Sequence, residues 1–323
     1  MNQTDFARML SRLRALHGEA ALLLNEPLSK WTTMRVGGPA DALFMPRYDY
    51  ELLSALRTAR EFDIPITIIG NGSNLIVRDG GIRGLTIRIC ARHDDGDSPT
   101  GKLWDVKLDG YHLITGAGAL LSAVANAATA AGLSGMEALS GIPGTVGGAA
   151  LMNAGAYEHE MSQVVQSVDA ISWNGSSYEH NNYTGTTLNY RYRGSAMMDD
   201  SAVITRVTML LQPDDPAIIK ERIADYTQRR KSKQPLTVPS AGSFFKRPPG
   251  HFAGKLIEDA GLKGYAVGGA MISPMHAGFV VNNGGATASD IITLMNNVVE
   301  RVQQNSGVTL EPEVRIIGED VSP

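Results

Sequence analysis

Two glycine-rich blocks, at residues 70–74 and 141–149, restrict the fold of this 323-residue chain more than any other feature. The first reads Gly-Asn-Gly-Ser-Asn and directly follows the apolar run 66–69. The second reads Gly-Ile-Pro-Gly-Thr-Val-Gly-Gly-Ala and contains no charged residue. Glycine permits positive φ angles and lets another group approach the backbone closely. Both blocks therefore predict sharp turns beside buried elements, where backbone could face a flat ring or an anion.

Each block also has a simpler interpretation, which stays open at this stage. Asn-Gly is common in ordinary tight turns, so 70–74 need not bind anything. Residues 141–149 could equally be the closely packed start of a buried helix. The first block does not have the GxGxxG spacing, and no helix obviously begins at Asn74, which disfavours a Rossmann cradle.

Apolar periodicity predicts a chain that mixes strands and helices, and hence an α+β fold. Strands are predicted at 42–46, 66–69, 75–77, 85–89, 164–173, 202–211, 278–282 and 314–317. Helices are predicted at the amphipathic N-terminus and at 51–62, 119–131, 218–230, 253–260 and 289–304. Asp215 is a candidate N-cap of one helix, and Ser289 or Ala288 of the last. The polar segment 91–112 predicts a hairpin or surface excursion.

Composition excludes several classes of protein. A net charge of −4 does not suggest a general nucleic-acid binder. The single cysteine, Cys90, rules out a disulfide framework, and its apolar surroundings favour a packed thiol over a catalytic one. The N-terminus has no signal-peptide core, and the charge-poor stretch 113–136 is a poor membrane span. We therefore expect a cytoplasmic protein with no membrane partner.

The segment 241–248 brings together a hydroxyl, two aromatic rings and two cations. Ser243 does not sit in a GxSxG elbow, so an acyl-transfer nucleophile is disfavoured. A serine hydroxyl can instead deliver a proton to a carbanion-like centre, although a simple turn cap is also possible. Lys246 and Arg247, and Lys233 upstream, suit phosphate or carboxylate groups, or form a solvated face.

Two further segments carry candidate charges. Tyr-Arg-Tyr-Arg at 190–193 alternates rings and cations, so that on a strand Arg191 and Arg193 would share one face. Glu313 opens the last predicted strand. Taken alone, each is more simply an exposed strand or an edge charge.

The order of these segments resembles the UDP-N-acetylenolpyruvoylglucosamine reductase (MurB) family over nearly the whole chain, from about residue 20 to residue 319. The matching segments are 32–40, 70–77, 139–149, 153–157, 190–195, 239–248, 277–282 and 313–318. The Pro-Ser-Ala-Gly-Ser and His-Ala-Gly-Phe segments are similar to the shorter type of the family. The resemblance implies an FAD-binding fold of the vanillyl-alcohol-oxidase type, with two FAD subdomains and a separate α+β substrate domain. The implied division is 1–90 with 309–323, then 91–213, then 214–308.

The resemblance also implies roles for particular residues. The implied catalytic residues are Ser243, as proton donor, with Arg193 and Glu313. The implied FAD-binding residues are Arg35, Gly70, Asn71, Gly72, Ser73, Asn74, Gly141, Ile142, Pro143, Gly144, Thr145, Gly147, Gly148, Asn153, Gly155 and Ala156. The implied substrate contacts are Lys233, Lys246 and Arg247.

The implied reaction is an NADPH-dependent, FAD-mediated reduction of UDP-N-acetylglucosamine enolpyruvate, a small-molecule substrate, with no metal. Nothing in the chain requires more than a monomer. Other hypotheses are another FAD oxidoreductase of the same fold acting on a sugar or alcohol, a nucleotide-binding module without activity, and a serine hydrolase. No histidine lies in the flavin-facing segments, which does not support covalent flavin attachment.

Overall fold

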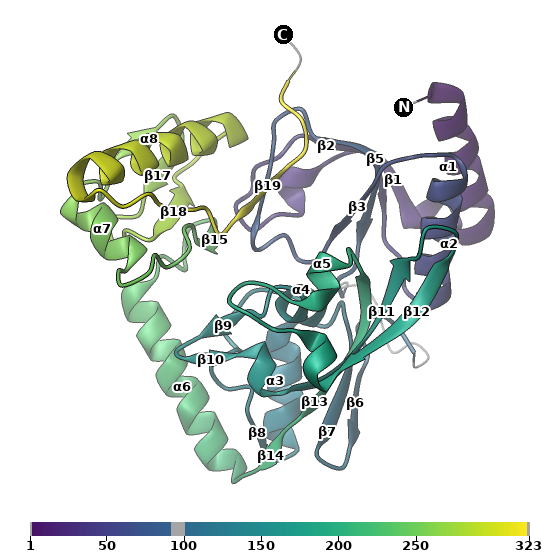
Figure 1. Cartoon of the computed structure of the whole chain (residues 1–323), viewed down its shortest axis with the longest axis horizontal. Helices are drawn as coiled ribbons and strands as arrows, with labels where there is room; N and C mark the ends of the chain where they lie inside the picture. Colours follow the sequence, from purple (N-terminus) through teal and green to yellow (C-terminus); the bar gives the residue numbers. More distant parts are fainter. Residues whose placement is uncertain (1, 92–100, 322–323) are drawn as a thin grey trace. The chain divides into compact units, whose positions relative to one another are not determined.

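The computed structural model describes residues 2–91 and 101–321. Helices and strands are mixed along the chain (Figure 1), which confirms the predicted α+β class. The chain forms two compact units. Unit 1 comprises Met1–Leu23, Leu43–Asn71 and Gly84–Gln228, and unit 2 comprises Leu24–Ala42, Gly72–Arg83 and Arg229–Pro323. The division into three domains stays a prediction.

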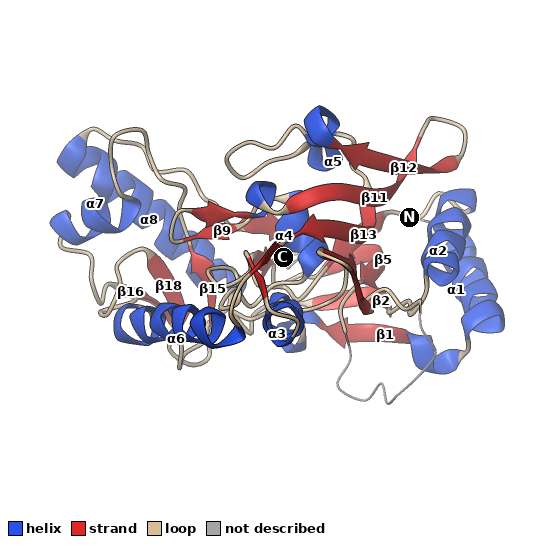
Figure 2. Ribbon diagram, turned by 90° about the horizontal axis from the view of Figure 1, so that it is seen from below, coloured by secondary structure: helices blue, strands red, loops and turns tan. Residues whose placement is uncertain are grey.

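Unit 1 begins with the predicted amphipathic helix, α1 (Gln3–His17), which is followed by the 3₁₀ turn η1 (Glu19–Ala21). The side chain of Asn2 caps α1 by accepting the N–H of Thr4. Figure 2 shows α1 beside α2 (Asp49–Glu61), and a salt bridge joins Arg12 to Glu61 at 2.7 Å. Burial of leucine, methionine and alanine on the facing sides of the two helices explains their apolar spacing.

One four-stranded sheet has the order β1-β2-β5-β3. Its strands are β1 (Leu22–Pro27), β2 (Pro39–Phe44), β5 (Ile82–Arg88) and β3 (Ile66–Ile69). β3 and β5 run parallel, with Ile68 opposite Ile87. A parallel pair needs a crossover connection between its strands, and β4 (Leu75–Val77) lies in that connection.

A five-stranded antiparallel sheet lies entirely within unit 1 and has the order β12-β11-β13-β7-β6. Its strands are β6 (Val106–Asp109), β7 (His112–Gly116), β11 (Val165–Trp173), β12 (Tyr178–Thr184) and β13 (Val203–Leu210). β6 and β7 form a hairpin that begins inside the segment 91–112, for which a hairpin or surface excursion was predicted. The remainder of the predicted excursion, at 92–100, lies outside the described residues.

Helices and short elements complete unit 1. They are α3 (Leu121–Ala130), β8 (Leu133–Ser134), α4 (Val146–Leu151), β9 (Gly155–Ala156), β10 (His159–Glu160), η3 (Met161–Gln163), η4 (Gly185–Leu188), α5 (Ala196–Asp199) and β14 (Gln212–Pro213). The alanine-rich helix α3 buries Leu121 and Val124, so the charge-poor stretch around it is a core helix. α6 (Pro216–Lys233) follows, and the N–H of Ala217 donates to Asp215 Oδ1 at 2.8 Å, which confirms the predicted cap.

Unit 2 is built around a four-stranded antiparallel sheet in the order β15-β18-β17-β16. Its strands are β15 (Ser240–Ser243), β16 (Ala266–Val267), β17 (Ala270–Ile272) and β18 (Phe279–Asn282). The helices α7 (Ala253–Asp259) and α8 (Ala288–Ser306) belong to the same unit, with the turn η2 (Leu28–Lys30). The C-terminal strand β19 (Arg315–Ile317) runs parallel to β4. Buried side chains of both helices and of the sheet form one apolar core.

The cap of α8 differs from the prediction. Neither Ser289 nor Ala288 is the N-cap; the cap is Thr287, whose hydroxyl accepts the N–H of Asp290 at 3.0 Å. The Asp290 side chain in turn accepts the N–H of Thr287, which completes a capping box. Ser289 is instead engaged by Asp79, which accepts its N–H and its hydroxyl. The predicted boundary was wrong because threonine and serine are both favourable N-cap residues, so residue type alone did not distinguish Thr287 from Ser289.

No helix within residues 2–91 and 101–321 is long and apolar enough to cross a membrane. Within the same residues, no group of three or more histidine, cysteine, aspartate or glutamate side chains could hold a metal ion.

Candidate functional site

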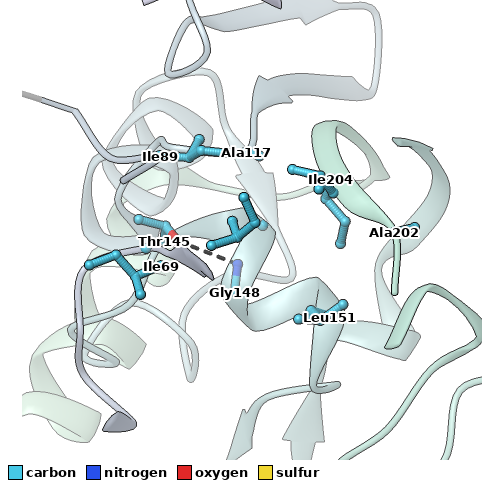
Figure 3. A pocket seen from close by; sticks show the side chains of 12 residues that line it. Ile69, Ile89, Ala117, Thr145, Gly148, Leu151, Ala202 and Ile204 are labelled. Atoms are coloured by element: carbon cyan, nitrogen blue, oxygen red, sulfur yellow. Dashed lines mark hydrogen bonds between the residues drawn. The ribbon is translucent and has the colours of Figure 1, made fainter. Parts of the chain in front are cut away.

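An apolar pocket of about 110 Å³ lies in unit 1, and glycine residues form part of its wall (Figure 3). The pocket lies between the end of β3, helix α4 and the start of β13. Ile89, directly after β5, and Ala117, directly after β7, complete its wall. The residues that line it are Ile68, Ile69, Gly70, Ile89, Ala117, Thr145, Gly147, Gly148, Leu151, Ala202, Val203 and Ile204. Four residues predicted to bind a cofactor are thus brought together, from both glycine-rich blocks.

Glycine is required at two of these positions for packing reasons. A Cβ atom on Gly147 would lie 2.7 Å from the Cβ of Ala117, and one on Gly70 would lie 2.5 Å from Thr145 Oγ1. Both distances are shorter than side chains tolerate. The interpretation of 141–149 as a closely packed helix start is therefore correct for Gly147, which is buried at the beginning of α4.

Gly148 differs from Gly147 because it is exposed in the pocket. Its N–H donates to the side chain of Thr145, the N-cap of α4, at 3.3 Å (Figure 3). A Cβ on Gly148 would meet only that hydroxyl, also at 3.3 Å. The second block thus combines a packed helix start with an exposed glycine that lets a ligand approach backbone.

Asn71 ties the two glycine-rich blocks together. Its Nδ2 donates to the carbonyl oxygen of Pro143 at 2.7 Å. Its Oδ1 accepts from Arg88 at 3.4 Å and faces the thiol of Cys90 at 3.6 Å. Burial raises the pKa of the Cys90 thiol, and nearby Arg88 opposes this shift. The thiol is buried, as predicted, and contributes to the support of the pocket.

The rest of the first block, Gly72 to Asn74, belongs to unit 2. Gly72 has φ of +64°, and a Cβ there would overlap the carbonyl oxygen of Trp31, so only glycine fits this turn. Asn74 Nδ2 donates to the carbonyl oxygen of Glu313 at 3.3 Å. The turn between β3 and β4 is accordingly a tight turn held by neighbouring backbone.

Two other predicted cofactor residues have left-handed backbone. Arg35 has φ of +57° and is exposed, and Asn153 has φ of +47° and is fully buried. Asn153 Oδ1 accepts the N–H of Ser162 at 2.9 Å, and its Nδ2 donates to the carbonyl oxygen of Arg191 at 3.3 Å. Asn153 therefore holds the segment that carries the candidate catalytic arginine. Gly155 and Ala156 form β9, opposite β10.

The segment 190–194 is a hairpin turn, not the predicted strand. Arg191 and Gly194 pair through two backbone hydrogen bonds, with Tyr192 and Arg193 at the tip and Arg193 at φ of +56°. The two arginines therefore do not share a strand face: Arg191 forms an ion pair with Asp199, whereas the Arg193 guanidinium lies 4.8 Å from the centre of the Tyr192 ring. Alternation of residue types predicted a strand, but two residues at a turn tip reverse the chain.

In unit 2, Ser243 ends β15 and is exposed. The next residue, Phe244, is fully buried and has both backbone groups engaged. Its N–H donates to the carbonyl oxygen of Gly278, and its carbonyl oxygen accepts the N–H of Glu313, both at 2.9 Å. Two of the three candidate catalytic residues, Ser243 and Glu313, are consequently held on neighbouring backbone segments although 70 positions separate them in sequence.

The three candidate substrate cations occupy different settings. Lys233 is the exposed last residue of α6, which continues past the predicted end at residue 230. Lys246 Nζ lies 3.1 Å from Glu311 Oε2, and the Arg247 guanidinium lies 4.1 Å from the centre of the Phe252 ring. The sequence did not predict a contact for any of these three side chains. The partners of Lys246 and Arg247 are Glu311 and Phe252, which lie in two different segments of the chain.

Sequence reasoning missed the apolar walls of the pocket. Ile69 ends a predicted strand directly before Gly70, and this position was a usable signal. Ile89 ends another predicted strand and Leu151 ends α4, but neither adjoins a glycine. Ala202 and Ile204 lie more than 50 residues further along the chain, and nothing local to them suggested a site.

The sheet arrangement and the glycine-lined pocket define an FAD-binding protein, and the FAD binding domain family matches residues 40–180. An apolar pocket with exposed glycine in its wall suits the flat ring of a flavin. The C-terminal domain of UDP-N-acetylenolpyruvoylglucosamine reductase matches residues 234–317. The chain belongs to the UDP-N-acetylenolpyruvoylglucosamine reductase family.

Individual relatives agree with this membership over almost the full length. The UDP-N-acetylenolpyruvoylglucosamine reductase of Pediococcus pentosaceus is 46% identical over 302 residues, covering 94% of this chain and 96% of the relative. That of Clostridium botulinum is 44% identical over 320 residues, covering 99% of both. The crystal structure of the reductase (MurB) from Thermus caldophilus matches with a TM-score of 0.74 and 37% identity, over 91% of this chain and 97% of that one. The predicted fold and family are confirmed.

Proposed function

We propose that this protein reduces UDP-N-acetylglucosamine enolpyruvate to UDP-N-acetylmuramate, with NADPH as reductant and FAD as cofactor, in peptidoglycan precursor synthesis. The observation that carries the proposal is identity of 44 to 46% with reductases of this name over at least 94% of the chain. The glycine-lined pocket inside the FAD-binding match supports the cofactor.

The pocket of unit 1 fits part of the cofactor. Gly148 offers exposed backbone, while Ile69, Leu151 and Ile204 give apolar walls that exclude water from a flat ring. The remaining cofactor contacts assigned by the family resemblance, from Arg35 to Ala156, belong to this proposal. Bound FAD would carry hydride between the nicotinamide and the enolpyruvyl group.

During reduction of the sugar, residues of this chain would stabilise the developing charge and donate a proton. Hydride arriving at C3 leaves negative charge on C2 and the neighbouring carboxylate. The Arg193 cation and the Glu313 carboxylic acid would stabilise that charge more strongly than the charge of the ground state. The Ser243 hydroxyl would donate a proton to C2. The exposure of Ser243 and the shared backbone contacts of Phe244 with Glu313 support this assignment.

Lys233, Lys246 and Arg247 would bind the substrate diphosphate or carboxylate, because these groups suit point charges and guanidinium forks. Binding there would compete with the ion pair of Lys246 and Glu311, which is exposed and therefore weak. We propose further that the protein is a cytoplasmic monomer and that it acts without a nucleic-acid or membrane partner.

The testing experiment follows the flavin spectrum of the purified protein without oxygen. Addition of NADPH should bleach the two visible bands of oxidised flavin, and UDP-N-acetylglucosamine enolpyruvate should restore them. Bleaching without return would retain the FAD-binding fold and favour another flavin oxidoreductase acting on a sugar or alcohol. Protein that takes up no FAD would refute the proposal.

A further inference from the structure

A continuous hydrogen-bonded path in unit 2 ends at the candidate catalytic serine and glutamate. It begins at the ring of His276, whose Nδ1 lies 3.1 Å from the backbone nitrogen of Gly278. The carbonyl oxygen of Gly278 accepts the N–H of Phe244 at 2.9 Å. The carbonyl oxygen of Phe244 accepts the N–H of Glu313, and Phe244 directly follows Ser243. The orientation of one imidazole is thus linked to the backbone on which both candidate residues lie.

The ring of His276 occupies a notch that two glycine residues provide. A Cβ on Gly278 would lie 3.0 Å from His276 Cε1, and a Cβ on Gly254 would lie 3.4 Å from the same atom. The edge of the Phe279 ring packs against the imidazole, with centroids 5.1 Å apart. The Ser273 hydroxyl accepts the backbone N–H groups of Met275 and His276, which fixes the start of the turn. The imidazole is therefore held in one position rather than free at the surface.

We propose that neutral His276 is a positioning residue, which holds Ser243 and Glu313 in place by accepting the N–H of Gly278. This inference rests on the proposed function, because it concerns the step in which the sugar is reduced. The His276 ring does not touch the sugar in this proposal, and it acts through the backbone N–H of Gly278. Without the acceptor, the Ala277–Gly278 peptide loses its hydrogen-bond partner, and φ of Gly278 is less restrained. The following peptide, whose carbonyl oxygen accepts the N–H of Phe244, keeps the hydrogen bond from the Phe279 N–H to the His276 carbonyl oxygen at 3.0 Å, but it can tilt away from Phe244.

The hydrogen bond requires that Nδ1 carries no proton, so the neutral tautomer has its proton on Nε2. Burial is the main effect on His276, and it lowers the pKa of the imidazole. The nearby charge of Lys263 lowers this pKa further, whereas a hydrogen bond to the backbone of His276 and the charge of Glu258 raise it. Lys263 and Glu258 form an ion pair with each other at 2.8 Å, at the end of α7. A lowered pKa means that the positioning contact persists at neutral pH and is lost as the pH falls through the pKa of the folded protein.

Three variants of the FAD-loaded protein separate positioning from packing. His276→Phe keeps an aromatic ring in the notch but removes the acceptor. His276→Asn restores an acceptor, because an asparagine Oδ1 can accept the N–H two residues further on. His112→Phe, a half-buried histidine on β7 in unit 1, is the matched control for the chemical change.

Stopped-flow absorbance measures the two half-reactions on the same sample: bleaching by NADPH, then return of the bands with UDP-N-acetylglucosamine enolpyruvate. We expect His276→Phe to slow the second by about 10- to 100-fold, since small misplacements of reacting groups have effects of this size. The first should be unchanged, and His276→Asn and His112→Phe should retain most of both rates.

The pH profile gives a second readout that a merely structural role would not change. In the parent protein, reoxidation by the sugar should slow as the pH falls through the His276 pKa, below the usual 6.5. His276→Asn should lack that transition. Normal reoxidation in His276→Phe, or an equal fall in both half-reactions, would overturn the inference. A parent protein that is bleached by NADPH but never reoxidised by the sugar would overturn the proposed function, and the inference with it.

Discussion

The glycine-lined pocket of unit 1 and the Ser243–Glu313 segments of unit 2 are built on opposite principles. The pocket depends on side chains that are absent: Gly70 and Gly147 are required because a Cβ at either would collide with Thr145 or Ala117. The unit 2 segments depend on polar groups held in place by backbone hydrogen bonds through Phe244. We therefore expect shape to select the ligand in the first region, and directed protons and charges to select it in the second. Substitutions in the pocket should therefore affect flavin binding, and substitutions at Ser243 or Glu313 should affect turnover.

The largest expected effect is on turnover alone. Ser243→Ala should reduce turnover by about 10² to 10³ or more, the usual result of losing one donor to a developing charge. Flavin content and bleaching by NADPH should be retained. The matched control is Ser240→Ala, three residues earlier on the same strand. Steady-state NADPH oxidation checks this prediction, and a normal rate in Ser243→Ala would remove the assignment of the proton donor.

A neighbouring pair of substitutions tests the pocket. Gly147→Ala should lower the free energy of unfolding by about 1–3 kcal/mol through overpacking against Ala117, and should also weaken flavin binding. In Gly148→Ala the new methyl group contacts only Thr145 Oγ1, at 3.3 Å, and a shift of a few tenths of an ångström relieves this tight contact. The variant should therefore keep the stability of the protein to within about 1 kcal/mol and weaken flavin binding only. Urea unfolding and FAD titration of the apoprotein distinguish the two. Equal losses of stability would contradict the packing argument.

A buried carboxylate supports unit 1 independently of the pocket. Glu137 accepts from the Ser134 hydroxyl, the Gly135 N–H and Arg222. Burial alone would raise the pKa of Glu137, but these hydrogen bonds prevail and lower it. Its stabilising contribution is thus present above the unfolded-state pKa and is lost as the pH falls through the folded-state pKa.

Glu137→Gln should reduce the free energy of unfolding by about 1–2 kcal/mol at neutral pH. The difference from the parent protein should shrink in acid, because the parent carboxyl becomes protonated there. Urea unfolding at several pH values measures this. Glu61→Gln, in the exposed pair with Arg12, serves as control and should change stability by about 0–1 kcal/mol. A pH-independent difference would show that charge is not responsible.

The smallest expected effect concerns a helix cap in unit 2. Thr287→Ala should cost about 1 kcal/mol of stability because it removes the acceptor for the Asp290 N–H. Thr287→Ser keeps that acceptor and should be close to the parent protein. Thermal unfolding provides the measurement. Turnover per flavin should be unchanged in both variants, and a selective loss would link α8 to catalysis against expectation.

The sequence allowed the α+β class and the family to be predicted, because glycine blocks and apolar runs leave a local signature. The cap at Asp215, and a hairpin or surface excursion in the polar segment 91–112, were also predictable from local composition. The strand at 190–193 was wrong, since alternating tyrosine and arginine does not reveal that Arg191 pairs with Gly194. The predicted cap of α8 was wrong because Thr287 and Ser289 are both suitable N-cap residues and stand only two positions apart.

By itself, the sequence determined which chemical groups are available at each candidate position. The hydroxyl of Ser243 and the absence of a Cβ at Gly148 are properties of the residue type and do not depend on the fold. Only the tertiary structure decided which of them meet. Ile204 joins the pocket wall through β13, and Glu313 reaches the backbone beside Ser243 through a hydrogen bond to Phe244. These contacts join residues far apart in the chain, and they form because strand pairing and core burial must satisfy many backbone groups and apolar faces at once.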